Sequence, residues 1–140
     1  IPVPVGGKVD RRHGAPLTVT GVVRTLSDGR FVHKGPMGRG LPGRLGTTAV
    51  LDVDDIKVIL ISYRWQTLDP EMLRFVGLEP LDHKILVVKS TIHYRAAFEP
   101  LAAEIIEVDA PGLSSSNLER FRFERVRRPI FPLDPETTYP

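Results

Sequence analysis

The chain has no cysteine, and this absence excludes two kinds of site. Neither a disulfide framework nor a metal centre with thiolate ligands can form without it. Long apolar runs are missing too: Val58–Ile61 is one of the longer ones, far short of the roughly 20 residues of a membrane-spanning helix. No basic segment followed by an apolar one opens the chain. We therefore expect no membrane contact and a cytoplasmic location.

Strong charge of one sign is also lacking. The 140 residues carry a formal net charge of +2, which is too small to indicate nucleic acid as a partner. Basic and aromatic residues do interleave between Arg120 and Phe131, a pattern that could suit single-stranded nucleic acid. No recognised nucleic-acid motif accompanies this segment, so we expect a solvated or docking segment and no nucleic-acid partner.

The composition indicates three parts. Residues 1–16 are rich in proline and glycine, which is typical of a connection that enters a domain, so we expect the chain to be part of a longer polypeptide. Residues 17–128 are long enough for one domain, and the 41% hydrophobic content of the chain can supply its core. Pro129 and Pro132 favour extended backbone before them, so residues 129–140 are predicted to form an extended tail.

The first half of the domain predicts antiparallel hairpins. Residues 17–26 have the valine and threonine content of a strand, and the turn sequence Ser27–Arg30 would return residues 31–33 beside it. The glycine-rich residues 35–46 are predicted to be a loop that could cover a neighbouring site. Its match to G-x-G-x-x-G is accidental, because Pro42 interrupts it and no helix follows.

A second hairpin is predicted from residues 47–53 and 56–63, with its turn at Asp54 and Asp55. Asp69 followed by a proline marks a short helix that ends near Gly77, because aspartate caps helix N-termini and proline suits the first helical position.

The second half predicts a strand, a helix and a strand. The apolar run Ile85–Val88 reads as a buried strand, a helix would begin near Thr91, and Pro100 must end it or start another. Residues 105–108 could be a second strand or a helix end. Antiparallel hairpins followed by this segment predict a single-domain α+β fold.

Polar residues follow the predicted strand 85–88, namely Lys89, Ser90, His93 and Arg95. Cations, a hydroxyl and an imidazole near a strand end suit a carboxylate or oxyanion. In a second interpretation, Ser90 or Thr91 only caps a helix and the cations are surface charges.

A smaller polar group, Arg64, Gln66 and Asp69, follows the strand predicted over residues 56–63. The two groups could therefore converge on one sheet edge. Alternatively, Arg64 and Asp69 only pair with each other, which is worth at most about 1 kcal/mol at the surface. No metal site is predicted, because the histidines are scattered and lack the spacings of zinc ligands.

Five short motifs occur in order along the chain: Val5–Lys8 with His13 and Gly14, Leu26–Phe31, Lys89 and Ser90, His93–Phe98, and Val108–Gly112. Together they resemble the C-terminal domain of the MlrC-like family of zinc metallopeptidases, which is associated with the breakdown of linearised microcystin. The resemblance implies that zinc and its ligands belong to an N-terminal domain of the same polypeptide. None of those ligands can be assigned to this chain.

Two functions remain open at this point. In the first, the chain is the C-terminal domain of a zinc-dependent peptidase or amidohydrolase. Its catalytic His93 and the substrate-binding residues Lys89, Ser90, Arg95, Arg64 and Gln66 then act on a peptide or amide substrate. In the second, the domain stabilises the catalytic domain or forms a homo-oligomer interface. A solvent-reachable cleft that contains His93 and Arg95 would favour the first, and burial of His93 in a packed core the second.

Overall fold

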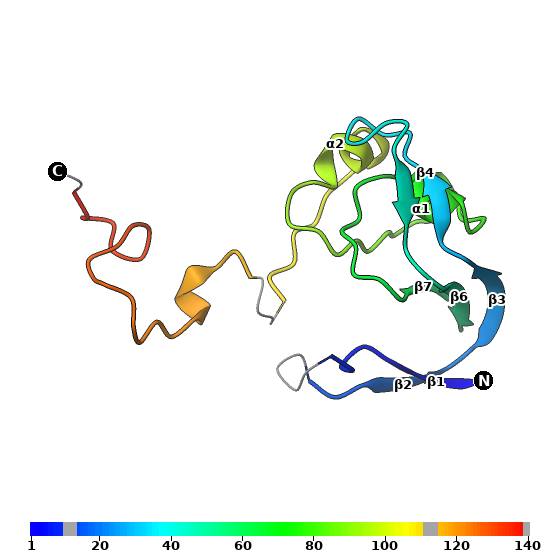
Figure 1. The fold of residues 1–140 in the computed structure, drawn as a ribbon, viewed down its shortest axis with the longest axis horizontal. Coiled ribbons are helices and arrows are strands. Elements are labelled where there is room, and N and C mark those ends of the chain that lie inside the picture. Colours follow the sequence, from blue (N-terminus) through cyan, green and yellow to red (C-terminus); the bar gives the residue numbers. More distant parts are fainter. Residues whose placement is uncertain (10–13, 111–114, 139–140) are drawn as a thin grey trace. The chain divides into compact units, whose positions relative to one another are not determined.

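The computed structural model describes residues 1–9, 14–110 and 115–138. The chain divides into two compact units, Ile1–Ile106 and Glu107–Pro140. In its described residues, the second unit has one short 3-10 helix, η3 (Leu118–Arg120), and is otherwise irregular. The motif residues His13, Pro111 and Gly112 lie outside the described residues. The first unit contains the strands, the α-helices and the polar residues predicted to form a site (Figure 1).

The strands of the described residues form three small antiparallel sheets, in the pairings β1–β2, β3–β6–β7 and β4–β5. Their bounds are β1 (Pro2–Val5), β2 (Leu17–Thr20), β3 (Val22–Ser27), β4 (Arg30–Val32), β5 (Pro42–Arg44), β6 (Thr48–Val53) and β7 (Ile56–Ile61). The predicted α+β class with antiparallel hairpins is confirmed.

The hairpin β6–β7 forms where the sequence predicted it. Val53 pairs with Ile56, so Asp54 and Asp55 make the turn. Asp54 has φ 51°, in the left-handed region that aspartate tolerates better than most residues because its short side chain can hydrogen-bond locally. β6 lies in the middle of its sheet, and Val50 and Leu51 are almost fully buried there.

The predicted strand 17–26 is divided in two, and the first hairpin prediction is wrong. Gly21 separates β2 from β3, and a Cβ atom there would lie 2.5 Å from the carbonyl oxygen of Asp52. β4 does not return beside β3 but pairs with β5, which lies inside the segment predicted to be loop. In this pair Phe31 lies opposite Gly43, whose missing side chain leaves room for the aromatic ring.

The described helices are all short: α1 (Glu71–Arg74), η1 (Pro80–Asp82), α2 (Arg95–Phe98) and η2 (Glu99–Leu101). α1 begins one residue later than predicted, with Pro70 at its N-cap position, but Asp69 still binds the start of the helix, since its Oδ1 accepts from the backbone N–H of Glu71 at 2.9 Å. α2 begins later than predicted and has no side-chain cap, so the capping interpretation of Ser90 and Thr91 is wrong. α2 ends just before Pro100, which lies within η2.

The two strands predicted around α2 are not formed. Residues 85–88 and 105–108 belong to no helix and pair with no strand in the described part of the chain. Ile85 is 83% exposed and Ile106 77% exposed, so these apolar runs are not buried as predicted. Their apolar character favours burial, but within the described residues they have no neighbouring strand to pair with.

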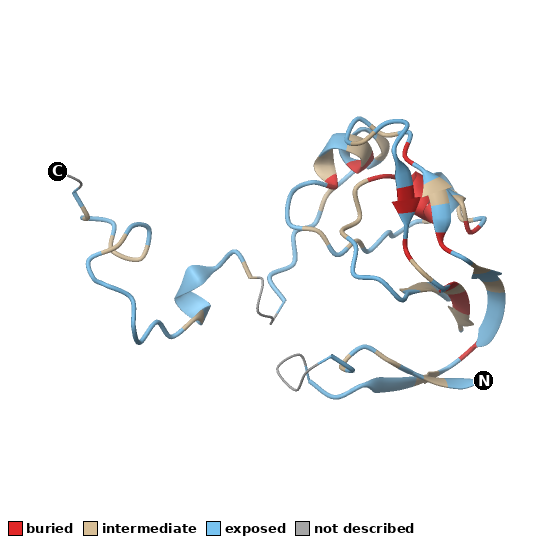
Figure 2. Cartoon of the chain, in the orientation of Figure 1, coloured by how far each residue is buried: buried red, intermediate tan, exposed pale blue. Residues whose placement is uncertain are grey.

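The core of the first unit lies where α1 and α2 meet the strands, and the buried residues gather there (Figure 2). Its buried cluster consists of Leu45, Met72, Leu73, Tyr94 and Phe98. Val88 and Ile105, the inner ends of the two unformed strands, pack against this cluster. The loop between Val88 and α2 therefore starts and ends on the core, which positions the polar residues it carries.

Candidate functional site

Three of the predicted site residues form a hydrogen-bonded chain. Gln66 Nε2 donates to Ser90 Oγ at 2.9 Å, and Gln66 Oε1 lies 2.9 Å from Nδ1 of His93. One residue of the second predicted polar group therefore meets two residues of the first, although the strand thought to bring Ser90 and His93 there is not formed. Gln66, from the segment after β7, is the residue that joins them.

The accessibility of this chain suits contact with a ligand. Gln66 and Ser90 are half-buried, whereas His93 is exposed. With the Gln66 amide oriented as above, Nδ1 of a neutral His93 donates to Gln66, which leaves Nε2 as an acceptor. The imidazole is therefore held by one nitrogen and presents the other to solvent.

The predicted cations are arranged less tightly. Arg64 and Lys89 are exposed and make no hydrogen bond or ion pair with the described residues. The guanidinium of Arg95 lies 3.3 Å from Oε1 of Glu99 and 5.5 Å from the centre of the Tyr94 ring. Of the predicted site residues, the structure thus joins Gln66, Ser90 and His93 by hydrogen bonds and leaves the cations outside this chain of contacts.

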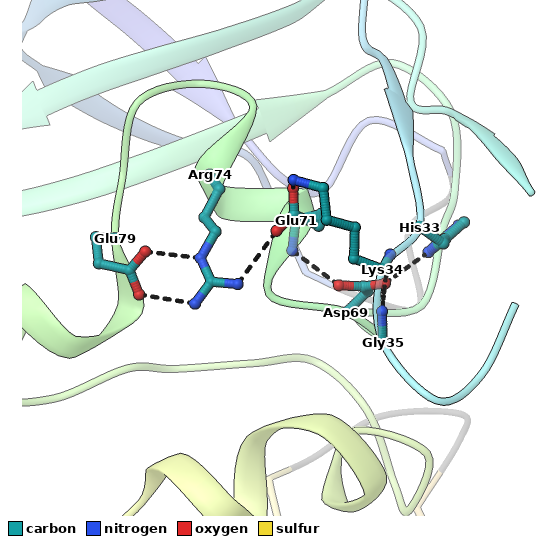
Figure 3. Close-up of polar contacts among 7 residues, drawn as sticks. All are labelled: His33, Lys34, Gly35, Asp69, Glu71, Arg74 and Glu79. Atoms are coloured by element: carbon teal, nitrogen blue, oxygen red, sulfur yellow. Dashed lines mark hydrogen bonds and ion pairs between the residues drawn. The ribbon is translucent and has the colours of Figure 1, made fainter. Parts of the chain in front are cut away.

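A second polar cluster, which the sequence did not reveal as such, centres on Asp69 (Figure 3). Asp69 is 1% exposed, and its Oδ2 accepts from the backbone N–H groups of Lys34 and Gly35 at 2.8 and 2.6 Å. His33 is also buried, and its Nδ1 lies 3.4 Å from the same oxygen. We call His33, Lys34, Gly35, Asp69, Glu71, Arg74 and Glu79 the Asp69 cluster.

The electrostatics of Asp69 follow from these contacts. Burial raises the pKa of the carboxyl group, but backbone hydrogen bonds from Glu71, Gly35 and Lys34 lower it by more, so the pKa lies below its ordinary value. Both oxygens accept from backbone donors. Asp69 is therefore an anionic anchor that ties the segment after β4 to the start of α1, and the alternative pairing with Arg64 is wrong.

The outer part of the Asp69 cluster consists of ion pairs. Glu71 lies 2.9 Å from Nζ of Lys34 and 3.1 Å from Nη1 of Arg74. Arg74 also donates to both oxygens of Glu79, at 2.6 and 2.9 Å, and these carboxylates raise its pKa. A shallow pocket beside the cluster is lined in part by Lys34 and Arg74. Because both cations are already paired, this pocket is a weak candidate for anion binding.

The sequence contained only part of this information. It identified Asp69 as a helix cap, but no local pattern indicated that Asp69 also binds backbone groups 34 and 35 residues earlier in the chain. His33 follows β4 and lies against the ring of Phe31, with centroids 4.7 Å apart. Only the pairing of β4 with β5 brings it to the cluster.

Neither a metal-ligand group nor a membrane-spanning helix is found in the described part of the chain. Residues 1–9, 14–110 and 115–138 contain no group of three or more histidines and carboxylates that could hold a metal ion. None of the helices described is long and apolar enough for a bilayer crossing.

The described residues form a small α+β module with a hydrogen-bonded polar chain at its surface. Its residues 1–125 match the family described as the MlrC C-terminus, and the chain belongs to this family. It is 29% identical over 131 residues to microcystinase C of Sphingomonas sp., a match covering 94% of this chain and 24% of that protein. A candidate metallopeptidase from Mesorhizobium sp. BNC1 has a crystal structure that matches with a TM-score of 0.79 and 32% identity. That match covers 96% of this chain and 26% of the other, so the chain spans about a quarter of either relative.

Proposed function

We propose that this chain is the C-terminal domain of a cytoplasmic, zinc-dependent metallopeptidase or amidohydrolase that cleaves a peptide or amide. The metal and its ligands belong to an N-terminal domain, the main partner of this chain. Residues 1–16 connect the two domains, 17–128 form the present domain and 129–140 its tail. Family membership supports the class of enzyme, and the described residues contain no metal-ligand group of their own.

The observation that carries a catalytic contribution is the exposed imidazole of His93. His93 is exposed, and its ring is oriented by Gln66, which also binds Ser90. An imidazole held in this way can donate to or accept from a substrate carbonyl or a developing oxyanion. Groups oriented in advance stabilise such charge because they need little rearrangement during the reaction.

The cations supply the rest of the proposed site. Arg64 precedes α1 and Lys89 precedes α2 in the chain; both are exposed, and neither is paired with a described carboxylate. They are suited to hold a substrate carboxylate together with Arg95, which would then share its guanidinium with Glu99, while Ser90 and Gln66 hydrogen-bond to the substrate or keep His93 in place.

A structural or oligomerisation domain is the second candidate. The exposed apolar side chains of the first unit favour it, since Ile85, Val87 and Ile92 are 83%, 89% and 61% exposed and need cover. In this case the domain stabilises the catalytic domain or forms a homo-oligomer, and the polar chain around Gln66 serves folding.

His93→Ala in the full-length, metal-loaded enzyme separates the two candidates. We expect kcat/KM on a short linear peptide substrate to fall by about 10²-fold, the scale of losing one oriented stabilising group, with an unchanged melting temperature. His83→Ala is the matched control, because His83 is half-buried beside η1 and has no proposed role. A stable His93→Ala enzyme with full activity would exclude the proposed catalytic role, and a less stable but equally active one would support the structural candidate.

A further inference from the structure

Residues Ile85–Val88 have the side-chain alternation of a strand without being part of one. Ile85 and Val87 are 83% and 89% exposed, whereas Leu86 is 37% exposed and Val88 is half-buried against the core cluster. Successive side chains of extended backbone point to opposite faces. One face of this segment therefore contacts its own domain, and the other presents large apolar side chains to solvent.

The backbone of the same segment is also unpaired. Within the described residues, no backbone hydrogen bond involves Ile85, Leu86, Val87 or Val88. A continuous apolar run rich in valine and isoleucine is typical of a strand covered on both faces, as in parallel sheets between helices. The segment thus lacks two kinds of partner within the described residues. A neighbouring strand would supply hydrogen bonds to its backbone, and an apolar layer would cover its exposed side chains.

We infer that Ile85–Val88 is an interdomain strand, which adds to the edge of a sheet in the N-terminal domain. This inference rests on the proposed function, in which that domain exists. The occupant follows from the comparisons: the matched family is a C-terminus, and about three-quarters of each relative lies outside the match. An extended segment added to a sheet edge gains backbone hydrogen bonds, and its outward side chains enter apolar pockets.

The segment is prepared for such pairing and leads directly to the candidate site. Pro80 is buried upstream and Val88 packs on the core downstream, so the intervening residues are held at both ends. Ser90, which binds Gln66, follows Val88 by two residues. Pairing of Ile85–Val88 with the N-terminal domain therefore brings Ser90, Gln66 and His93 to the boundary between the domains.

Hydrogen exchange in the full-length protein tests the inference. We expect the amides of residues 85–88 to exchange at least about 100-fold more slowly than those of the exposed, irregular residues 103 and 104, at every protein concentration. Exchange as fast as that of residues 103 and 104 would overturn the inference. Protection that disappears on dilution would overturn it too, because it would identify a second copy as the partner.

A pair of variants locates the effect. Val87→Lys places a charge on the outward face and should abolish the protection of residues 85–88, whereas Leu81→Lys, at a 63% exposed position in η1, should not. Protection that survives Val87→Lys would count against pairing through this face.

Exchange measured on the His93→Ala protein distinguishes the two proposals. Protection of residues 85–88 that is retained while activity is unchanged supports the interdomain strand and refutes the catalytic role of His93. Lost protection in the wild type together with a 10²-fold activity loss in His93→Ala does the reverse.

Discussion

The Asp69 cluster and the chain Gln66–Ser90–His93 are both built from polar residues, but they differ in what satisfies them. Asp69 is 1% exposed, and its charge is balanced by backbone N–H groups and its neighbours inside the domain. His93 is exposed, with one ring nitrogen bound to Gln66. A buried group must be satisfied internally or it destabilises the fold, whereas an exposed one remains available for a ligand. This contrast identifies Asp69 as an internal anchor and leaves His93 accessible for the ligand contact proposed above.

Asp69→Asn should break the buried side of this contrast with the largest effect. The substituted amide cannot accept at all of the positions that the carboxylate uses, so we expect the free energy of unfolding to fall by about 3 kcal/mol, measured by urea denaturation. Asp28→Asn is the matched control, because Asp28 also accepts from a backbone N–H, that of Arg30, but is exposed. Equal effects of the two substitutions would contradict the assignment of Asp69 as an anchor.

Acid should weaken the same anchor in the wild type. The pKa of Asp69 is lower in the folded than in the unfolded chain, so the stability it contributes is present above the unfolded-state value of about 4 and lost as the pH falls through the lower folded-state value. His33 is the titratable side chain that faces it. We expect the difference in unfolding free energy between wild type and Asp69→Asn to shrink steadily below about pH 4. A constant difference across the acid range would show that the carboxylate charge is not what stabilises the wild type.

Gln66→Ala should have the smallest effect on stability. It tests whether Gln66 orients the exposed His93. Gln66 is half-buried and its partners are polar side chains, so we expect a loss of about 0.5 kcal/mol or less in unfolding free energy. Because His93 would then be free to rotate, kcat/KM of the full-length enzyme should fall by about tenfold, less than for His93→Ala. Thr67→Ala, at the next half-buried position, is the control. A large loss of stability in Gln66→Ala would place Gln66 with the structural residues instead.

Local chemistry was enough to predict some elements of the fold. The turn at Asp54 and Asp55 and the helix start at Asp69 depend on a few adjacent residues; the turn forms as predicted, and the helix begins one residue later than predicted. Pairing across longer distances was not predictable in the same way. The turn residues Ser27–Arg30 suggested a hairpin, but β4 pairs with β5 because Gly43 accommodates the ring of Phe31.

The candidate site shows the same division. The sequence predicted polar residues of a site after residues 63 and 88. Three of them, Gln66, Ser90 and His93, do come together. The reason offered for their meeting was wrong, since Ile85–Val88 does not form a strand within the described residues. Apolar composition predicts that a segment will be buried, but it does not specify which partner covers it.

The sequence by itself determined the class of the fold, the short-range turns and caps, and the family to which the chain belongs. These properties follow from residue identity and from the order of motifs along the chain. Only the tertiary structure decided that Asp69 is a buried anchor, that His33 lies beside it, and that His93 remains exposed. Those outcomes depend on which distant backbone donors reach a side chain, and on whether water is excluded from it, and both are set by packing between segments far apart in the chain.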